Sequence, residues 1–184
     1  MKDQWNQIEE SLLSLDCLER VRLRPGASPS QIAELEQHLG VRLPERLKAF
    51  LSIHDGQDGS VGLVGGETLL SVENIRKEWD AWRSIDEEAM NADCADFMAS
   101  QPEGFIKPMY TNRLWIPLTK DWGGNHLGLD YDPDKKGSVG QVIRFGRDED
   151  TKRLVARSFE DFVSLLVSAM EAARWNGEYL ESTI

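Results

Sequence analysis

The sequence predicts an α+β fold. Apolar residues recur at helical spacing in the first half of the chain, short alternating strands separated by turns follow between residues 114 and 156, and a capped helix comes last. Because the turns between these strands are too short for a crossover helix, we expect the strands to pair antiparallel. With 184 residues the chain has the length of one hydrophobic core, so we predict a single domain over residues 1–184.

Three helices are expected before the first long polar loop. The first starts near Asp3 and ends before the turn segment RPGASPS, as the spacing of four apolar residues indicates: Trp5, Ile8, Leu12 and Leu15. The second has Ser28 as N-cap, Pro29 at its first position, Gln31 as capping-box partner and Gly40 as its stop. The third opens at Pro44 and leads into the glycine-punctuated loop 54–59.

The middle of the chain predicts two short strands and one long helix. The strands are expected at Val61–Val64 and near Leu69–Leu70. Ser71 is a suitable cap for a helix that continues to about Met90. Residues 91–108 show neither the helical nor the strand spacing of apolar residues and are interpreted as a loop-rich insertion.

A meander of four strands and a final helix complete the predicted fold. The strands are expected at Leu114–Leu118, His126–Asp130, Gln141–Phe145 and Arg153–Ala156, joined by turns rich in Asp, Gly and Pro. Ser158 and Asp161 then cap a last helix with the apolar residues Phe159, Phe162, Leu165, Leu166 and Met170. In the tail that follows, we expect Gly177 to end the helix and Trp175 to pack on the domain.

Charge and cysteine usage exclude several classes of function. The chain has 21 Lys and Arg against 32 Asp and Glu, a net charge of −11, which repels nucleic acids and anionic membranes and attracts a basic protein. Cys17 and Cys94 fit no metal or disulfide pattern, and no apolar run is long enough for a signal peptide or a membrane span. We therefore expect a cytoplasmic protein.

No catalytic, metal or cofactor motif is found. The spacing of Asp130, Asp132 and Asp134 is that of the first ligands of a calcium loop, but Lys135 and Gln141 stand where such a loop needs glycine and glutamate. The three histidines have no HExxH partner, and no GxSxG elbow or phosphate-binding loop is present. We predict no enzyme activity, no metal and no cofactor.

Several segments in order resemble a known family. They are PGAS-x-x-x-I-x-x-LE-x-x-LG-x-x-LP-x-x-L-x-x-FL at 25–51, the HDGQ turn, LLSVENI, and GGNHLGLDYDP…GQVIRFG…VARSFEDFVSLL. The chain resembles the Smi/Knr-type domain of the SUKH superfamily, which is named for a fungal regulator of cell-wall glucan synthesis and is abundant in bacterial toxin-immunity loci. The resemblance implies a strongly twisted antiparallel sheet flanked by helices that binds other proteins, without enzyme activity.

The candidate partner-binding residues are acidic and aromatic side chains in turns. Aromatic anchors surrounded by polar groups are typical of protein interfaces. Trp79, Trp82 and Trp115 follow helix or strand periodicity and are expected in the core, whereas Trp122 lies in a glycine-bounded turn. The candidates are Asp55, Asp58, Asp121, Trp122, Asp130, Asp132 and Asp134.

Three functions are compatible with these observations. The leading hypothesis is an immunity protein that neutralises a cognate, basic bacterial toxin. The alternative is a regulatory or scaffold protein of the cell-wall assembly type, with an endogenous client. A third hypothesis, an enzyme acting on a small molecule at the concave face of the sheet, requires a deep pocket with convergent polar groups.

Overall fold

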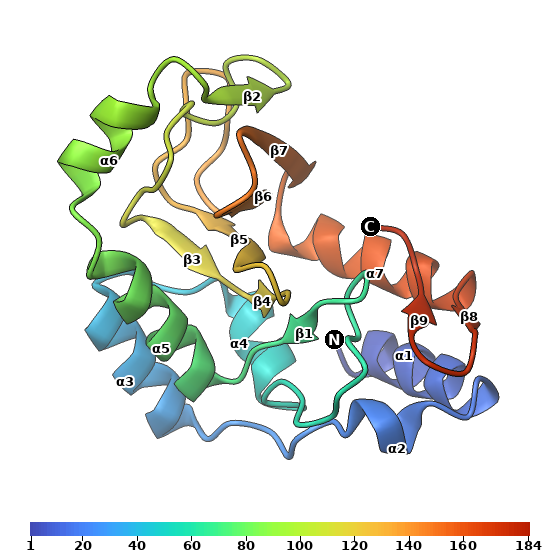
Figure 1. Cartoon of the computed structure of the whole chain (residues 1–184). Helices are drawn as coiled ribbons and strands as arrows, with labels where there is room; N and C mark the ends of the chain where they lie inside the picture. The colour runs from blue at the N-terminus through green and yellow to red at the C-terminus, as the bar shows by residue number, and fades with distance from the viewer. The chain divides into compact units, whose positions relative to one another are not determined.

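The computed structural model describes all residues, 1–184 (Figure 1). The chain divides into two compact units. Unit 1 comprises residues 1–76 and 163–184, and unit 2 comprises residues 77–162. Two helices, α5 (Val72–Arg83) and α7 (Phe159–Glu171), run across the boundaries. The class is α+β, as predicted, whereas the assignment of residues 1–184 to one domain with an insertion at 91–108 stays a prediction. None of the helices is both long and apolar enough to span a membrane.

Unit 1 is mainly helical. Its elements are α1 (Lys2–Ser14), α2 (Leu18–Val21), α3 (Pro29–Leu39), α4 (Glu45–Leu51), β1 (Thr68–Leu69), the start of α5, most of α7, β8 (Arg174–Trp175) and β9 (Leu180–Glu181). The predicted capping box is confirmed, because Ser28 Oγ accepts from the Gln31 amide and the Gln31 side chain accepts from the Ser28 amide. Trp5 of α1 is fully buried, stacks on Phe50 at 4.4 Å between ring centroids, and donates its indole N–H to the Phe50 carbonyl.

Two local expectations for unit 1 are wrong, and one short helix was not foreseen. Residues 61–64 form no strand, and only an isolated bridge joins Val64 to Glu67. The short helix α2 was not expected, because four residues are too few to show a period. The last helix ends at Glu171, and the tail returns as the β8–β9 hairpin with Gly177 in its turn at φ +100°. Trp175 is half-buried there, with the Arg20 guanidinium 5.2 Å from its ring centroid.

One buried glutamine organises the long loop of unit 1. Gln57 is 2% exposed, and its amide nitrogen donates to the carbonyls of Val61 (2.7 Å) and Val21 (3.3 Å). Its amide oxygen accepts from the backbone N–H groups of Leu63 and Leu69, each at 3.0 Å. A single side chain therefore satisfies four backbone groups, two within the loop (Val61 and Leu63) and one each in α2 (Val21) and β1 (Leu69).

We expect Gln57→Leu to destabilise the protein by at least about 3 kcal/mol, since each buried group left without a partner costs about 1–3 kcal/mol. Urea unfolding at neutral pH measures the change. Gln37→Leu, at an exposed position of α3, is the matched control and is expected to stay within about 0.5 kcal/mol of the parent. Equal stabilities of the two variants would refute the role of Gln57.

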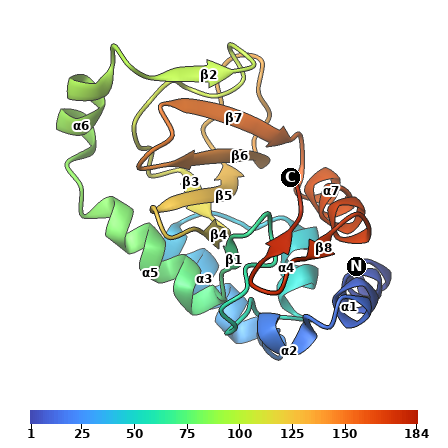
Figure 2. The same ribbon diagram turned by 45° about the vertical axis from the view of Figure 1, so that its right-hand side comes forward.

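Unit 2 contains a mixed five-stranded sheet. Its elements are the end of α5, α6 (Glu87–Cys94), β2 (Ala99–Gln101), β3 (Trp115–Pro117), β4 (Thr119–Lys120), β5 (Asn125–Asp130), β6 (Gln141–Gly146), β7 (Thr151–Ala156) and the start of α7. The strand order is β2-β7-β6-β5-β3 (Figure 2). The four predicted strands pair antiparallel, with Ile116 opposite Leu129 and Gly128 opposite Ile143. A Cβ at Gly128 would lie 2.2 Å from the Ile116 carbonyl oxygen, so the β3–β5 pairing requires glycine there.

Two expectations for unit 2 are corrected. Strand β2 lies within the segment interpreted as loop-rich and pairs with β7 in parallel, so the sheet is not wholly antiparallel. No short turn joins β2 to β7, and the meander argument therefore does not apply to this pair. The helix expected from Ser71 to Met90 breaks after Arg83, because Asp86 acts as the N-cap of α6 and accepts from the Ala89 amide at 3.1 Å.

Lys152 on β7 is a fully buried lysine. Its Nζ donates to the Glu149 carbonyl oxygen, lies 5.9 Å from the ring centroids of both Tyr110 and Trp115, and forms no ion pair with a carboxylate. Burial lowers the pKa of Lys152 to about 8, against the opposing effect of the negative charges of Glu149 and Asp150. Two aromatic rings therefore take the place of a counter-ion.

We expect Lys152→Met to raise stability at pH 7, because a thioether of similar length removes the desolvation cost of a buried ammonium. The folded pKa is below the unfolded pKa of about 10.4, so the parent protein gains stability as the pH rises from about 8 to 10, by about 3 kcal/mol at most. The variant lacks this gain. The difference in the free energy of unfolding between the variant and the parent therefore shrinks between about pH 8 and 10. Parallel pH profiles in urea unfolding would contradict the assignment.

Candidate functional site

The turn between β4 and β5 presents one tryptophan to solvent. Trp122 is 97% exposed, and the turn beneath it is held by the carboxylate of Asp121. Asp121 Oδ1 accepts from the amides of Gly123 (2.8 Å) and Asn125 (2.7 Å), and Oδ2 accepts from Asn125 Nδ2 (2.9 Å). Burial raises the pKa of Asp121, but the hydrogen bonds from Asn125 and Gly123 outweigh burial, and the net effect is a lowered pKa. Asp121 is therefore ionised at neutral pH and holds the turn in one conformation.

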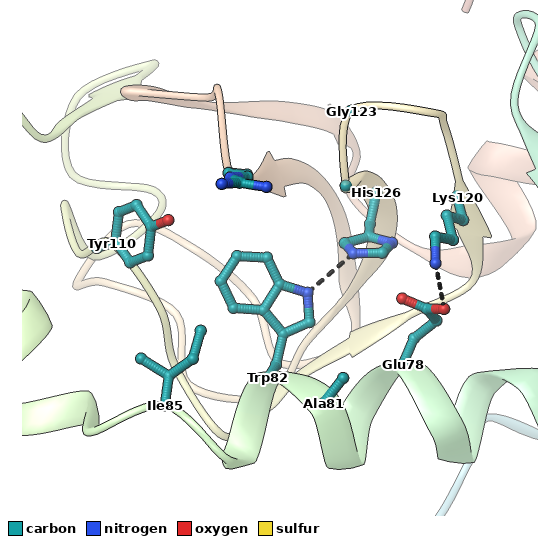
Figure 3. A pocket seen from close by; sticks show the side chains of 10 residues that line it. Glu78, Ala81, Trp82, Ile85, Tyr110, Lys120, Gly123 and His126 are labelled. Carbon is teal, nitrogen blue, oxygen red and sulfur yellow. Dashed lines mark hydrogen bonds and ion pairs between the residues drawn. The ribbon is translucent and has the colours of Figure 1, made fainter.

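A pocket of about 370 Å³ lies directly beside this turn (Figure 3). Ala81, Trp82 and Ile85 line it from α5 and the residues that follow, and Tyr110 forms a further aromatic wall. Gly123 and Gly124, which follow Trp122 in the chain, complete its edge. The rings of Trp82 and Tyr110 are 6.0 Å apart between centroids, so the pocket has an aromatic lining.

A buried histidine fixes the orientation of Trp82. His126 is fully buried, and its Nε2 accepts the indole N–H of Trp82 at 2.9 Å. Its Nδ1 lies 2.7 Å from the Thr119 carbonyl oxygen, which only accepts, so Nδ1 carries the proton and the ring is the neutral Nδ1–H tautomer. Burial is also the main cause of the lowered pKa of His126. Both ring nitrogens are occupied, and His126 therefore positions Trp82 and is not available as a general base.

The charged groups around the pocket are few. Lys120 pairs with Glu78 at 2.6 Å, and this ion pair is visible at one side of the pocket in Figure 3. Arg147, which also lines the pocket, forms no ion pair. The chemistry available is therefore an apolar, aromatic surface with one guanidinium that forms no ion pair, an arrangement suited to binding a side chain.

The structure separates the predicted partner-binding residues into several environments. Asp121 and Trp122 lie together on the exposed turn. Asp130 is fully buried, and its carboxylate accepts from Trp115 Nε1, Gln141 Nε2 and the Asp132 amide; burial raises its pKa. Asp132 contacts Lys107 and Asn112, and Asp134 accepts from the Lys135 amide. Asp130 is therefore withdrawn from solvent, which argues against direct partner contact by its carboxylate.

The remaining candidates belong to unit 1. Asp55 is 5% exposed and accepts from the Val72 amide at the start of α5 (2.7 Å), and burial raises its pKa. Asp58 is exposed and pairs with Arg24 at 2.7 Å. The partner-binding role of the seven candidate residues stays a prediction. Only Asp121 and Trp122 lie on the exposed turn beside the pocket.

Sequence reasoning missed the pocket itself. Trp79 and Trp115 are buried as expected, but Trp82 is only half-buried and lines the pocket. Trp82 follows the apolar period of its helix, so the sequence pattern could not distinguish it from a core residue. Tyr110 and Arg147 belong to no motif or periodic pattern in the sequence. The one available sign was the Gly123–Gly124 pair, which was interpreted as a turn only.

Comparison with known proteins decides the family. The model of the SMI1 / KNR4 family (SUKH-1) matches residues 26–165. The chain belongs to this family. It is 36% identical to the cell wall biosynthesis/cell cycle regulator smi1 of Schizosaccharomyces pombe over 95% of the chain, and 33% identical to the glucan synthesis regulatory protein of Neurospora crassa over 84%. It is 29% identical to the cell wall assembly regulator SMI1 of Saccharomyces cerevisiae over 79% of the chain.

These relatives correct the functional hypothesis. They are named as fungal regulators of the cell wall and of glucan synthesis, so the immunity function is wrong and a toxin partner has no support. The alternative, a regulatory protein, is favoured. The chain covers 37% of the length of the S. pombe relative and 35% of each of the other two. It therefore corresponds to about a third of those proteins.

We expect His126→Asn to destabilise the protein at pH 7 by at least about 1 kcal/mol, because the hydrogen bond to Trp82 is lost. Since the folded pKa of His126 is below its unfolded value of about 6.5, the parent loses stability as the pH falls below about 6.5. The variant has no such titration, so the difference between parent and variant narrows between pH 7 and pH 5. Urea unfolding between pH 7 and pH 5 measures this change. A difference in the free energy of unfolding that stays constant with pH would contradict the neutral tautomer of His126.

Proposed function

We propose that this chain is a non-enzymatic, protein-binding module of a regulator of cell-wall and glucan synthesis. It holds a client protein against the surface formed by the Trp122 turn and the aromatic pocket. The observation that carries the proposal is the exposure of Trp122 on a turn that three hydrogen bonds to the Asp121 carboxylate hold in place. The names of the fungal relatives support the proposed process, cell-wall and glucan synthesis. The exposed surface supports the proposed mechanism, binding of a client protein.

Preorganisation of the Trp122 turn favours binding of a partner. Tryptophan is enriched among the residues that dominate protein interfaces, and a side chain already held in position loses less entropy when a partner covers it. Trp122 has nearly its whole surface in water, although burying a large aromatic side chain contributes about 1.5–3 kcal/mol. The net charge of −11 favours a client with a basic surface, whose approach such a field accelerates.

A chimera in fission yeast tests the proposal. The segment of the S. pombe relative that aligns with this chain is replaced by the chain, in cells that lack the native regulator. We expect the chimera to restore resistance to cell lysis by β-glucanase, and the Trp122→Ala chimera to lose most of that rescue. Phe97→Ala, which removes an exposed aromatic side chain outside the pocket, is the matched control and is expected to rescue fully.

Each outcome of this experiment has a defined meaning, provided that immunoblots show equal amounts of the chimeras. Failure of the unmodified chimera would refute the proposed process. Full rescue by Trp122→Ala would refute the assignment of client binding to the turn. Equal loss in Trp122→Ala and Phe97→Ala would show that the chimera senses exposed aromatic residues in general, and would also refute that assignment.

A further inference from the structure

The chain carries a protruding aromatic side chain and a pocket for one on the same surface. Trp122 projects into solvent, and the next two residues, Gly123 and Gly124, already line the pocket. The pocket volume of about 370 Å³ is at the lower end of the range for ligand sites, which suits one large side chain. Projection and pocket are therefore direct neighbours in unit 2.

The lining of the pocket matches the chemistry of an indole ring. Trp82 and Tyr110 offer ring faces and edges for aromatic contact, and their pairs contribute about 0.5–1.5 kcal/mol beyond burial. Arg147 has no ion-pair partner, and a guanidinium is a favourable neighbour for the face of an inserted tryptophan. The bond from Trp82 to His126 holds this lining in place before anything binds.

We infer that the pocket is occupied by Trp122 of a second copy of this chain, in a reciprocal two-fold dimer. In a two-fold interface both copies use the same surface. Trp122 of each copy can therefore enter the pocket of the other, and the assembly stops at two copies. The charges at the contact itself are complementary, because Asp121 and Asp148 stand beside the glycine turn and Arg147 lines the pocket. Each Arg147 then faces the acidic turn of the other copy. The net charge of −11 on each copy opposes association over longer distances and weakens the dimer.

The size of the interface sets the strength of the dimer. A tryptophan buries about 150–250 Å², so two inserted side chains and the pocket walls that they cover give a total of about 600–1,000 Å². This is at or below the lower limit of specific interfaces and predicts a weak, reversible dimer. The inference does not depend on the cell-wall function, although a dimer would cover the surface that we propose for the client.

Sedimentation velocity of the full chain from 1 to 500 µM tests the dimer. The unmodified protein is expected to shift from monomer to dimer over this range. Trp122→Ala, at an exposed turn position, is expected to raise the dissociation constant at least tenfold. Ala81→Glu places a carboxylate in the pocket and is expected to have the same effect although Trp122 is retained, whereas Phe97→Ala leaves the dissociation constant unchanged.

Dilution NMR locates the contact. We expect the indole N–H signals of Trp122 and Trp82 and the amide signals of Gly123 and Tyr110 to move together with concentration, and Trp122→Ala to abolish the movement at Trp82 and Tyr110. A protein that stays monomeric at 500 µM overturns the inference. A dimer that Trp122→Ala and Ala81→Glu leave intact, or concentration-dependent signals outside the pocket only, overturns it as well. A protein that stays monomeric overturns the dimer and leaves the proposed client binding standing, whereas failure of the unmodified chimera overturns the proposed process and leaves the dimer standing.

Discussion

The burial of strand β5 is the constraint on which the rest of unit 2 depends. All six residues from Asn125 to Asp130 are buried, and three of them have polar side chains that would be costly without partners. Each finds its partners in a different part of the unit. Asn125 binds the Trp122 turn and the amide of Asp148, His126 binds Trp82 and Thr119, and Asp130 binds Trp115 and Gln141.

The candidate site follows from these partners. Because Asn125 and Asp121 hold the turn, Trp122 projects from a rigid base, and because His126 is neutral, it accepts the indole N–H of Trp82 and fixes the pocket wall. The same buried groups that complete the sheet thus shape the surface beside it. A binding surface built on a fully hydrogen-bonded strand requires little rearrangement when a partner arrives, and this is the physical basis for assigning binding to it.

The correction from immunity protein to regulator shows how far fold and function are separable. The capping box, the HDGQ turn and the strand pattern are requirements of folding, exemplified by Gln57, whose side chain satisfies four backbone groups. Such features serve folding whatever the domain binds, so they do not identify its partner. Partner choice is a property of the surface, where we propose that Trp122 acts, and the names of the fungal relatives favour the regulatory function over immunity.

The sequence by itself determined the elements that local forces control. The caps at Ser28 and Ser158, the helix stop at Gly40 and the four alternating strands were predicted, because the residues that create these signals are close together in the chain. Tertiary structure alone decided the parallel pairing of β2, the return of the tail as a hairpin and the burial of Asp55, Asp130 and Lys152. It also decided that Trp82 lines a pocket, because burial depends on which distant residues arrive at a side chain, and no local pattern records that.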